Sequence, residues 1–473
     1  MLWNGISLIM WAILFIINYF ASAYEEKVIQ LISSDIREYI ANKLSVASFQ
    51  NVKSNNEGTY ISWLNNDIQQ IEANGLRQYF EFWSNLFSVG LSIVALVTYH
   101  YSLLLVTFLL MGLMLKFPSF FEKKMNQATE QLAVANEAFI SKIQDTIAGY
   151  ETFYSFNIFN RMKRNINDAS FQLKDEKVKY VQSTKYAEGF IGFVNIVSQV
   201  AIVTATGVLA YLNVVTIGAL SSTGNLASTI FNAVSQGSQN LMLYKTVDVY
   251  FSKYQAFELR QVEHFRDIPF KTSIQLENIH YAFDGKDILK DINFTFEKSK
   301  KYAVIGESGA GKSTLLNIIS GRINDFEGSI IVDNQRVSDT NNLRYIFSYI
   351  AQQPHIFNDT LKDNITLWRN IEPGMLDTIA SKLRINAFAS LNQMIEENGQ
   401  NLSGGQKQRI AVARIMLNQH KIYLLDEMTA NLDKESAIMI ENMLLDDKDA
   451  TVIMVTHHLY EENKHKFDDV LCL

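Results

Sequence analysis

Three long stretches without a charged side chain constrain this sequence more than any other feature. Residues 1–24, 82–115 and 189–244 contain no Asp, Glu, Lys or Arg, and the last two stretches are 34 and 56 residues long. An α-helix rises about 1.5 Å per residue, so about 20 apolar residues cross the hydrocarbon core of a bilayer. The first stretch is therefore long enough for one membrane span, and each of the others for two spans joined by a turn.

The charges between these five spans predict their orientation. We expect the spans at about 3–24, 77–98, 102–121, 189–212 and 218–243. The two long connections, 25–76 and 122–188, contain four and ten Lys or Arg residues, whereas the two short connections contain none. Because positively charged loops stay in the cytoplasm, residues 1–245 are predicted to form a domain of the plasma (cytoplasmic) membrane whose long helical loops are cytoplasmic.

The rest of the chain has an ordinary density of charge and is predicted to form a second domain. We place a linker at 246–270 and this domain at 271–473. The net charge of −7 gives no reason to propose nucleic acid as a partner. A single cysteine, Cys472, excludes a disulfide framework within the chain.

A phosphate-binding motif lies early in the second domain. Residues 306–313 match the pattern G-x-x-x-x-G-K-[ST], between an apolar run at 301–305 that predicts a buried strand and a run at 314–320 that predicts a helix. Glycines let backbone N–H groups converge on phosphate oxygens, and the helix N-terminus adds partial positive charge. Lys312 is expected to reach the β- and γ-phosphates of ATP, and the Ser313 hydroxyl to bind Mg²⁺. The ATP-binding residues expected here are Gly306, Glu307, Ser308, Gly309, Ala310, Gly311, Lys312, Ser313 and Thr314.

Two adjacent carboxylates supply the groups that such a loop needs. Asp426 and Glu427 follow the apolar run 421–425, which predicts a strand, and α/β sheets bind their ligands at the C-terminal ends of strands. Asp426 is expected to hold Mg²⁺, and Glu427 to polarise the attacking water as a general base. Two solvated acids at a strand end would be an adequate explanation in isolation, but the phosphate-binding motif upstream favours the catalytic interpretation.

A third motif runs from Leu402 to Gln406, with the sequence Leu-Ser-Gly-Gly-Gln, and is followed by Lys-Gln-Arg. With it, residues 273–473 resemble the nucleotide-binding domain of an ABC transporter, and the whole chain resembles an exporter-type half-transporter. In that family this signature motif contacts the γ-phosphate of ATP held by the opposite subunit. A helix start of this composition also suits an anion. The resemblance implies the contact for Ser403, Gly404, Gly405 and Gln406.

Four further positions gain a role from the resemblance. Gln352 matches the glutamine that senses the metal and contacts the membrane domain, and Asp433 belongs to the loop through which the two ATP sites communicate. His457 matches the histidine that touches the γ-phosphate, which makes it a catalytic residue beside Glu427. Phe283 aligns with the aromatic residue that stacks on adenine; a Tyr two positions earlier is the alternative, and we favour Phe283.

Two features of the membrane half keep two interpretations each. Residues 57–67 and 149–156 resemble the cytoplasmic loops that dock on the ATPase domains of exporters, but other amphipathic helices would show the same apolar periodicity. The last predicted span carries four amides on one helical stripe. They form either a polar wall of a transport path or hydrogen bonds between helices. These amides are Asn225, Asn232, Gln236 and Gln239.

We therefore expect an α-helical membrane domain plus an α/β P-loop ATPase domain with a helical subdomain. The resemblance implies ATP-driven export of a drug-like, peptide or lipid substrate by a homo- or heterodimer in a lipid bilayer, with ATP and Mg²⁺ as cofactors. The alternatives are an importer or lipid flippase of the same fold, and a truncated ATP-binding fragment without transport. The sequence departs from the family's usual six spans in having five, the first matching the family's second, and in having few residues after His457.

Overall fold

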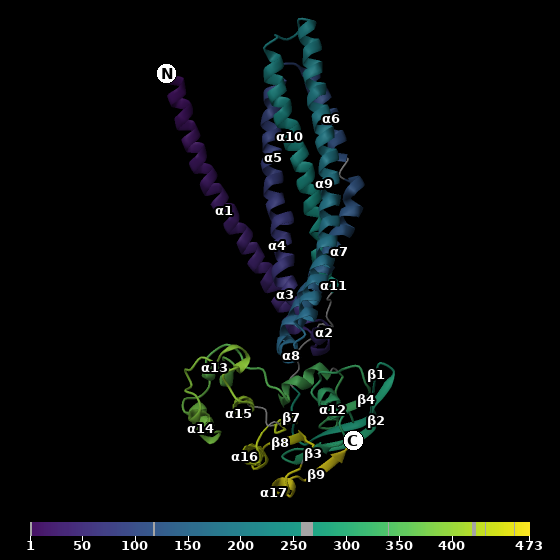
Figure 1. The fold of residues 1–473 in the computed structure, drawn as a ribbon, viewed down its shortest axis with the longest axis vertical. Coiled ribbons are helices and arrows are strands. Elements are labelled where there is room, and N and C mark those ends of the chain that lie inside the picture. Colours follow the sequence, from purple (N-terminus) through teal and green to yellow (C-terminus); the bar gives the residue numbers. More distant parts are fainter. Residues whose placement is uncertain are drawn as a thin grey trace. The chain divides into compact units, whose positions relative to one another are not determined.

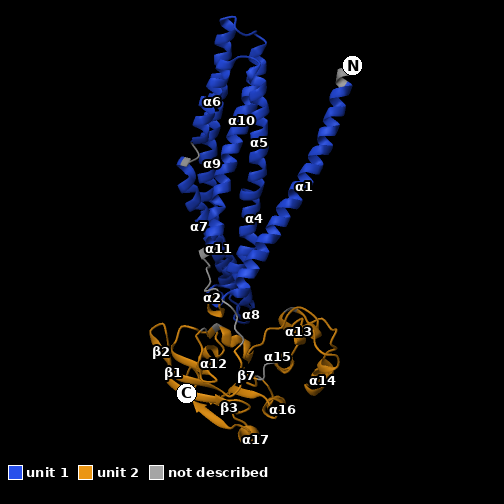
Figure 2. Ribbon diagram, turned by 180° about the vertical axis from the view of Figure 1, so that it is seen from behind, with its two compact units in different colours: residues 1–47, 52–260 blue, residues 48–51, 261–473 orange. Residues whose placement is uncertain are grey.

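The computed structural model describes residues 2–116, 119–256, 268–338, 340–418, 422–430, 432–457 and 459–473. The chain divides into two compact units, residues 1–47 with 52–260 and residues 48–51 with 261–473 (Figure 2). Each unit has its own hydrophobic core, as the change in charge density along the sequence predicts.

The first unit is built from helices (Figure 1). In chain order the N-terminal half contains α1 (Leu2–Val46), α2 (Phe49–Ser54), α3 (Glu57–Ser62), the π-helix η1 (Trp63–Asp67), α4 (Ile68–Gln70), the π-helix η2 (Ile71–Leu76), α5 (Arg77–Val97), α6 (Tyr101–Lys116), α7 (Ser119–Ala148), α8 (Tyr150–Ser155), α9 (Phe159–Tyr211), α10 (Ala219–Thr246) and α11 (Asp248–Ala256). The helical elements from α3 to α5 follow one another without a break and form one long rod.

Four of the described helical stretches are long and apolar enough to cross a membrane. They are Gly5–Val46, Glu57–Val97, Tyr101–Ala148 and Phe159–Tyr211, and they cover most of each of the first four predicted spans. Residues 117 and 118, in the third predicted span, lie outside the described residues. The apolar window of α1 is 0% buried, since α1 diverges from the other helices of its unit toward its N-terminal end (Figure 1).

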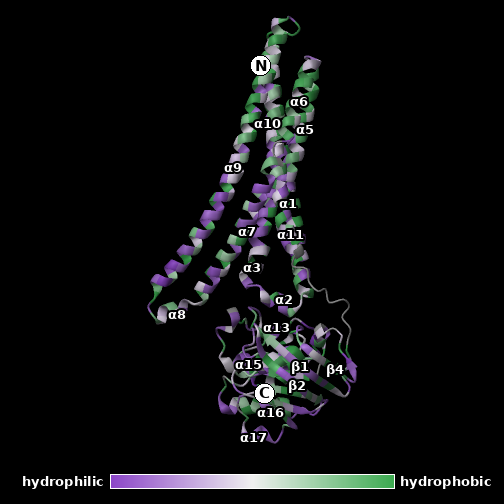
Figure 3. Cartoon of the chain, turned by 90° about the vertical axis from the view of Figure 1, so that its right-hand side faces the viewer, coloured by the Kyte–Doolittle hydropathy of each residue, from purple (hydrophilic) through white to green (hydrophobic). Residues whose placement is uncertain are grey.

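Apolar side chains lie on both the inside and the outside of the helical bundle. Leu96, Leu103, Ile202 and Phe231, from four different helices, are fully buried in one cluster. Large apolar side chains also cover the outer faces of the helices, where Figure 3 shows hydrophobic colouring along α5, α6, α9 and α10. A bundle that is apolar on its outer surface is stable only in an apolar solvent, which agrees with the predicted membrane location.

The fifth predicted span, 218–243, is the helix α10, but its composition sets it apart. It is rich in Ser, Thr, Asn and Gln and does not belong to the four stretches of high hydropathy. Many of its residues are buried against neighbouring helices, among them Ile230, Phe231 and Val234. A helix shielded by protein needs less apolar surface than one exposed to lipid. That α10 crosses the membrane stays a prediction.

Two short helices connect the long ones. The segment 149–156 contains α8, which links α7 to α9 where the resemblance places a loop tip. The other expected tip, 57–67, was wrongly placed, because those residues form α3 and η1 and the short connecting helix is α2. Asn56 has an extended backbone and Glu57 lies in the first turn of α3, which are the properties of a helix start.

The first part of the predicted linker, 246–270, is also helical. It contains the end of α10 and all of α11, because Tyr250 and Tyr254, one helical turn apart, pack into a cluster with Trp63 and Ile68. Residues 257–267 of the linker lie outside the described residues.

The second unit combines two sheets with helices. Its antiparallel sheet has the order β2-β1-β4-β5, and its second sheet, parallel in every pairing, has the order β6-β7-β8-β3-β9. The strands are β1 (Ser273–Phe283), β2 (Lys286–Glu297), β3 (Lys301–Ile305), β4 (Glu327–Val332), β5 (Gln335–Arg336), β6 (Ser348–Ile350), β7 (Ile422–Asp426), β8 (Thr451–Val455) and β9 (Asp469–Cys472). The helices are α12 (Lys312–Ile319), α13 (Leu361–Thr366), α14 (Met375–Lys382), α15 (Gly404–Met416), α16 (Lys434–Leu445) and α17 (Glu461–Lys464), with short 3₁₀ turns at Thr340–Tyr345, Ile385–Ala387 and Glu397–Gly399.

The cores of this unit explain the arrangement. One cluster joins the antiparallel sheet to α12 and β3, and the other joins α13, α14 and α15 to β7 and β8, so that a helical subdomain packs beside the sheet. All residues of β7 and β8 are buried, as expected for strands covered on both faces. The expected α/β domain with a helical subdomain is thus confirmed, and the loops that follow β3, β6, β7 and β8 lie at one edge of the parallel sheet.

Candidate active site

The phosphate-binding motif forms the turn between β3 and α12. Gly309 and Gly311 have φ values of 85° and 91°, which are left-handed conformations that a side chain strains. A Cβ atom on Gly311 would also lie 2.8 Å from Leu289 and 3.1 Å from Ile288 of β2. Only glycine therefore fits at Gly311, and no side chain caps the first N–H groups of α12.

Lys312 lies within this turn. Its side chain is buried, and its Nζ donates to the carbonyl oxygens of Gly306 and Glu307 at 3.0 and 2.9 Å. The same Nζ is 3.5 Å from Nδ1 of His457. The motif thus brings one ammonium group and several backbone N–H groups to one place, which is the chemistry that recognises phosphate.

Ser313 and Asp426 lie next to each other, although they follow or end different strands of the parallel sheet. The Ser313 hydroxyl donates to Oδ1 of Asp426 at 2.9 Å. Asp426 is 7% exposed, at the last position of β7, whereas Ser313 is exposed at the start of α12. Hydroxyl and carboxylate oxygens at this separation are ligands that suit Mg²⁺.

Glu427 contacts side chains from two other loops, so that three loops meet at its carboxylate. Its Oε1 accepts from Nε2 of His457 at 2.6 Å, and its Oε2 accepts from Nε2 of Gln352 at 2.9 Å. Gln352 follows β6, Glu427 follows β7 and His457 follows β8, so the parallel register of these strands assembles the group. The backbone of Glu427 has φ 48° and its N–H donates to the carbonyl of Val455 at 3.1 Å. The structure therefore brings Lys312, Ser313, Gln352, Asp426, Glu427 and His457 together.

Phe283 and Tyr281 differ in exposure. Phe283 is 66% exposed at the end of β1, whereas Tyr281 is partly buried against the core beneath the antiparallel sheet. The β1–β2 hairpin that carries Phe283 also carries Ile288 and Leu289, which border the turn at Gly311. An exposed ring on this hairpin is free to stack on a base, so Phe283 is the better candidate of the two.

The signature motif lies on a different helix from the phosphate-binding turn. Ser403 caps α15, because its Oγ accepts from the N–H of Gln406 at 3.3 Å and its own N–H donates to the Gln406 side chain at 2.7 Å. Gly404 is exposed, and Gly405 lies against Leu432. The motif makes none of the described hydrogen bonds to Lys312, Asp426 or Glu427, which agrees with a role outside the site of its own chain.

Two contacts connect the signature helix to the other loops. Gln408 donates to the backbone carbonyl of Gln352 at 2.8 Å, and Arg409 donates to the Ser436 hydroxyl at 3.3 Å. Asp433 caps α16 by accepting from the N–H of Ser436 at 2.9 Å, and this bond lowers the pKa of the Asp433 carboxyl. Asn431, in the same loop, lies outside the described residues.

Sequence reasoning missed two residues beside Asp426. The Tyr349 hydroxyl donates to Oδ2 of Asp426 at 3.0 Å, and Cζ of Arg322 lies 3.5 Å from the centre of the Tyr349 ring. Burial raises the pKa of Tyr349 and lowers that of Arg322. The only signal in the sequence was a tyrosine three positions before Gln352.

Of the two interpretations of the four amides on α10, the structure shows hydrogen bonding between helices. Asn195 of α9 donates to Asn232 at 2.8 Å, and Gln199 donates to both Asn195 and Asn232 at 2.9 and 3.2 Å. Gln236 and Gln239 instead bond to residues of α10 itself. Hydrogen bonding between helices is thus confirmed for Asn232, and the polar wall stays a prediction for the exposed amides. These are Asn225, Asn232 and Gln236.

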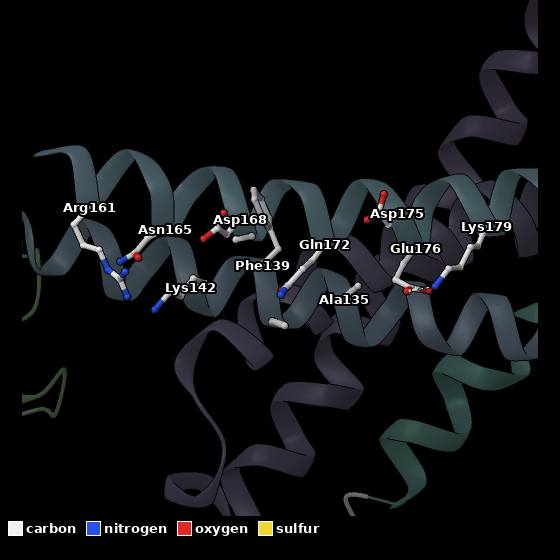
Figure 4. A pocket seen from close by; sticks show the side chains of 12 residues that line it. Ala135, Phe139, Lys142, Arg161, Asn165, Asp168, Gln172, Asp175, Glu176 and Lys179 are labelled. Carbon is white, nitrogen blue, oxygen red and sulfur yellow. Dashed lines mark hydrogen bonds and ion pairs between the residues drawn. The ribbon is translucent and has the colours of Figure 1, made fainter.

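A groove of about 720 Å³ lies between α7 and α9 (Figure 4). Basic and acidic side chains line it in equal number, and Lys179 forms an ion pair with Glu176 at 2.7 Å. The charges therefore balance, and the groove offers no net charge to a ligand. The charged residues are Lys142, Arg161, Lys179, Asp168, Asp175 and Glu176.

Comparison with known families covers both units. The model of the ABC transporter family matches residues 289–430, and the model of the ABC transporter transmembrane region matches residues 1–234. The chain belongs to the ABC transporter family. In this transporter the transmembrane region and the ATP-binding domain are fused in one chain, as they are in exporter-type half-transporters.

Individual relatives cover most of the transporter. It is 26% identical over 471 residues to a protein of Staphylococcus aureus strain NCTC 8325 named "Putative multidrug export ATP-binding/permease protein", a match that covers 94% of this chain and 79% of that protein. The protein of the same name from strain Mu50 gives the same values. A solved structure described as a bacterial Atm1-family ABC exporter with ATP bound matches the fold with a TM-score of 0.85 at 20% identity, over 95% of this chain and 81% of that one.

Proposed function

We propose that this chain is one half of a dimeric ABC exporter in which ATP hydrolysis drives a substrate across the membrane. The observation that carries the hydrolytic part is the convergence of Gln352 and His457 on Glu427, next to the Ser313–Asp426 pair. The apolar helices of the first unit and the relatives' printed export function support the transport part.

ATP would bind through groups that the turn after β3 already presents. The N–H groups at the start of α12 and the Lys312 ammonium receive the phosphates, since both are positive and Lys312 is held among backbone carbonyls. Phe283 supplies an exposed ring for adenine. These groups position the triphosphate, and positioning with charge stabilisation is most of what phosphoryl transfer requires.

The donor set beside the turn fits Mg²⁺. Ser313 and Asp426 provide a hydroxyl and a carboxylate oxygen that lie 2.9 Å apart, and Gln352 provides an amide oxygen from the next loop. Once bound, the ion would neutralise the charge that develops on the phosphates.

Glu427 is the general base in this proposal. A base must reach the proton of the attacking water within about 3 Å. Both of its carboxylate oxygens already accept hydrogen bonds, from His457 and Gln352. Each oxygen keeps a second lone pair, so the attacking water would donate to Glu427 beside these two partners.

A second subunit completes the site. The signature residues Ser403 to Gln406 form the N-terminus of α15, and none of the described hydrogen bonds joins them to Glu427. In a dimer they would contact the γ-phosphate of the nucleotide bound by the partner, as the family resemblance implies. Homodimers and heterodimers are both compatible with this arrangement, because this chain carries a full set of motifs.

The test is ATP hydrolysis by purified protein in lipid. Glu427→Gln should lower the hydrolysis rate by at least about 100-fold, because the base is lost, and should leave ATP affinity within about threefold. Glu435→Gln, at an exposed position on α16, is the matched control and should hydrolyse ATP normally. Normal hydrolysis by Glu427→Gln would show that another group is the base. Lack of hydrolysis by the unsubstituted protein would contradict the proposed function itself.

A further inference from the structure

The Asp426 carboxylate is held from two sides. Ser313 donates to its Oδ1 at 2.9 Å, and Tyr349 donates to its Oδ2 at 3.0 Å. A carboxylate with one hydrogen bond can still rotate about its last torsion, but a bond to each oxygen fixes the plane of the group. The orientation of Asp426 is therefore set by its two neighbours as well as by its own strand.

The position of Tyr349 is itself rigid. It is the middle residue of β6, which pairs in parallel with β7 and places Tyr349 opposite Leu424. Asp426 ends β7 two residues later, and β7 is buried along its whole length. The distance between the phenol and the carboxylate thus follows from strand register, which loop motion does not alter.

Arg322 fixes the ring of Tyr349. Its guanidinium Cζ lies 3.5 Å from the centre of that ring and 4.8 Å from the centre of the Phe49 ring, so the cation contacts two aromatic rings. Phe49 is one of the residues 48–51 that belong to the second unit. The backbone N–H of Arg322 donates to the carbonyl of Asn317 at 2.8 Å, which ties it to the end of α12. The helix that begins with Lys312 and Ser313 therefore also anchors this cation.

We propose that Tyr349, held by Arg322, is a positioning residue that orients Asp426 for Mg²⁺. The inference rests on the proposed ATP site. Hydrogen bonds from outer residues to metal-binding carboxylates fix the ligand's orientation and tune its affinity. With Oδ2 held by Tyr349, Oδ1 is the oxygen left to bind the ion beside the Ser313 hydroxyl. Arg322 and Tyr349 act through Asp426 and do not contact the ion.

The test measures metal binding without turnover. The full-length protein in lipid is mixed with ADP and Mn²⁺, and bound Mn²⁺ is counted by electron paramagnetic resonance. Tyr349→Phe keeps the ring on Arg322 and deletes only the hydroxyl, so it should weaken Mn²⁺ binding about tenfold. ADP binding in the presence of a chelator should stay within about twofold of the unsubstituted protein. Tyr345→Phe, which removes a nearby hydroxyl that accepts from Arg344, should change neither quantity.

A second variant tests the outer part of the arrangement. Arg322→Met keeps much of the apolar stem and removes the cation over the ring, so Mn²⁺ binding should weaken by about threefold, less than in Tyr349→Phe. Unchanged Mn²⁺ binding in Tyr349→Phe would overturn the inference, and so would an equal loss of ADP binding with and without metal, since that would show a general structural role. If the unsubstituted protein bound no ADP at all, the proposed ATP site would fail, and this inference with it.

Discussion

Two helix starts in the second unit, those of α12 and α15, contain similar residues, but only the α15 start is capped by a side chain. The residue before α12, Gly311, has a left-handed backbone and offers no side chain to cap the helix. The residue before α15, Ser403, has an extended backbone and forms a capping box with Gln406. Both starts combine glycine with Ser and carry the partial positive charge of a helix N-terminus.

The difference favours α12 as the start that binds an anion within its own chain. The uncapped N–H groups of α12 need a partner, and Lys312 beside them adds a full charge, so a phosphate is the expected partner. The capping box of α15 satisfies one N–H of the helix and the N–H of Ser403 itself. The α15 start therefore needs no ligand within its own chain, which agrees with its proposed contact with the partner's nucleotide.

The largest effect is expected when the positive charge of Lys312 at the start of α12 is removed. Lys312→Ala should lower ATP hydrolysis by about 1,000-fold and ATP affinity at least tenfold, because the ammonium is the only side-chain cation in the described turn. Hydrolysis in lipid and binding of a fluorescent ATP analogue measure the two effects. Lys407→Ala, a change of the same size in the first turns of α15, is the matched control and should keep ATP affinity within about twofold. Equal losses in the two variants would mean that the two starts do not differ.

A smaller effect is expected at the other start. Ser403→Ala should lower hydrolysis by about 10- to 100-fold, because the partner's γ-phosphate loses a hydroxyl donor. It should also destabilise α15 by about 1 kcal/mol through loss of the cap. ATP affinity of the same chain should stay within about threefold, and this separates Ser403 from Lys312. A drop in affinity as large as that of Lys312→Ala would place both helix starts at one nucleotide within one chain.

A third helix start shows what a cap contributes alone. Asp433 caps α16, and its hydrogen bond to the Ser436 N–H lowers its pKa below the ordinary value of 3.8. Because the pKa is lower in the folded protein, the ionised form stabilises the fold above pH 3.8, and this contribution is lost as the pH falls toward the lowered pKa. Asp433→Asn keeps the capping oxygen, so its melting temperature should lie slightly below that of the unsubstituted protein at pH 7. The two values should converge below pH 4, and a constant difference across this range would contradict the assignment.

The sequence predicted the centre of the site because its residues are neighbours in the chain. Lys312 and Ser313 belong to one spacing pattern, and Asp426 and Glu427 are adjacent, so no knowledge of the fold was needed to predict a role for each. Tyr349 and Arg322 were missed because their contact with Asp426 depends on the register of β6 and β7. Such pairings join residues that are far apart in the chain, and one sequence does not reveal them.

In the membrane half, too, the sequence predicted features of single segments but not the contacts between them. Absence of charge located four apolar helices, since hydropathy is a property of each segment by itself. It did not locate the first short connecting helix, because Asn56 and Glu57 act as a helix start and the break occurs before them at α2. It also did not show that Asn232 bonds to α9, which depends on how two helices face each other.

The backbone of Glu427 has a consequence for protein engineering. At φ 48° the backbone of a residue other than Gly or Asn stores roughly 1 kcal/mol or more of strain. Glu427 is held in this conformation because it follows β7 directly and its N–H donates to the carbonyl of Val455. A procedure that optimised stability alone would replace Glu427 by glycine and would remove the proposed base together with the strain. Thermostabilised versions of such a chain should therefore be designed with this one position kept fixed, however unfavourable its local geometry scores.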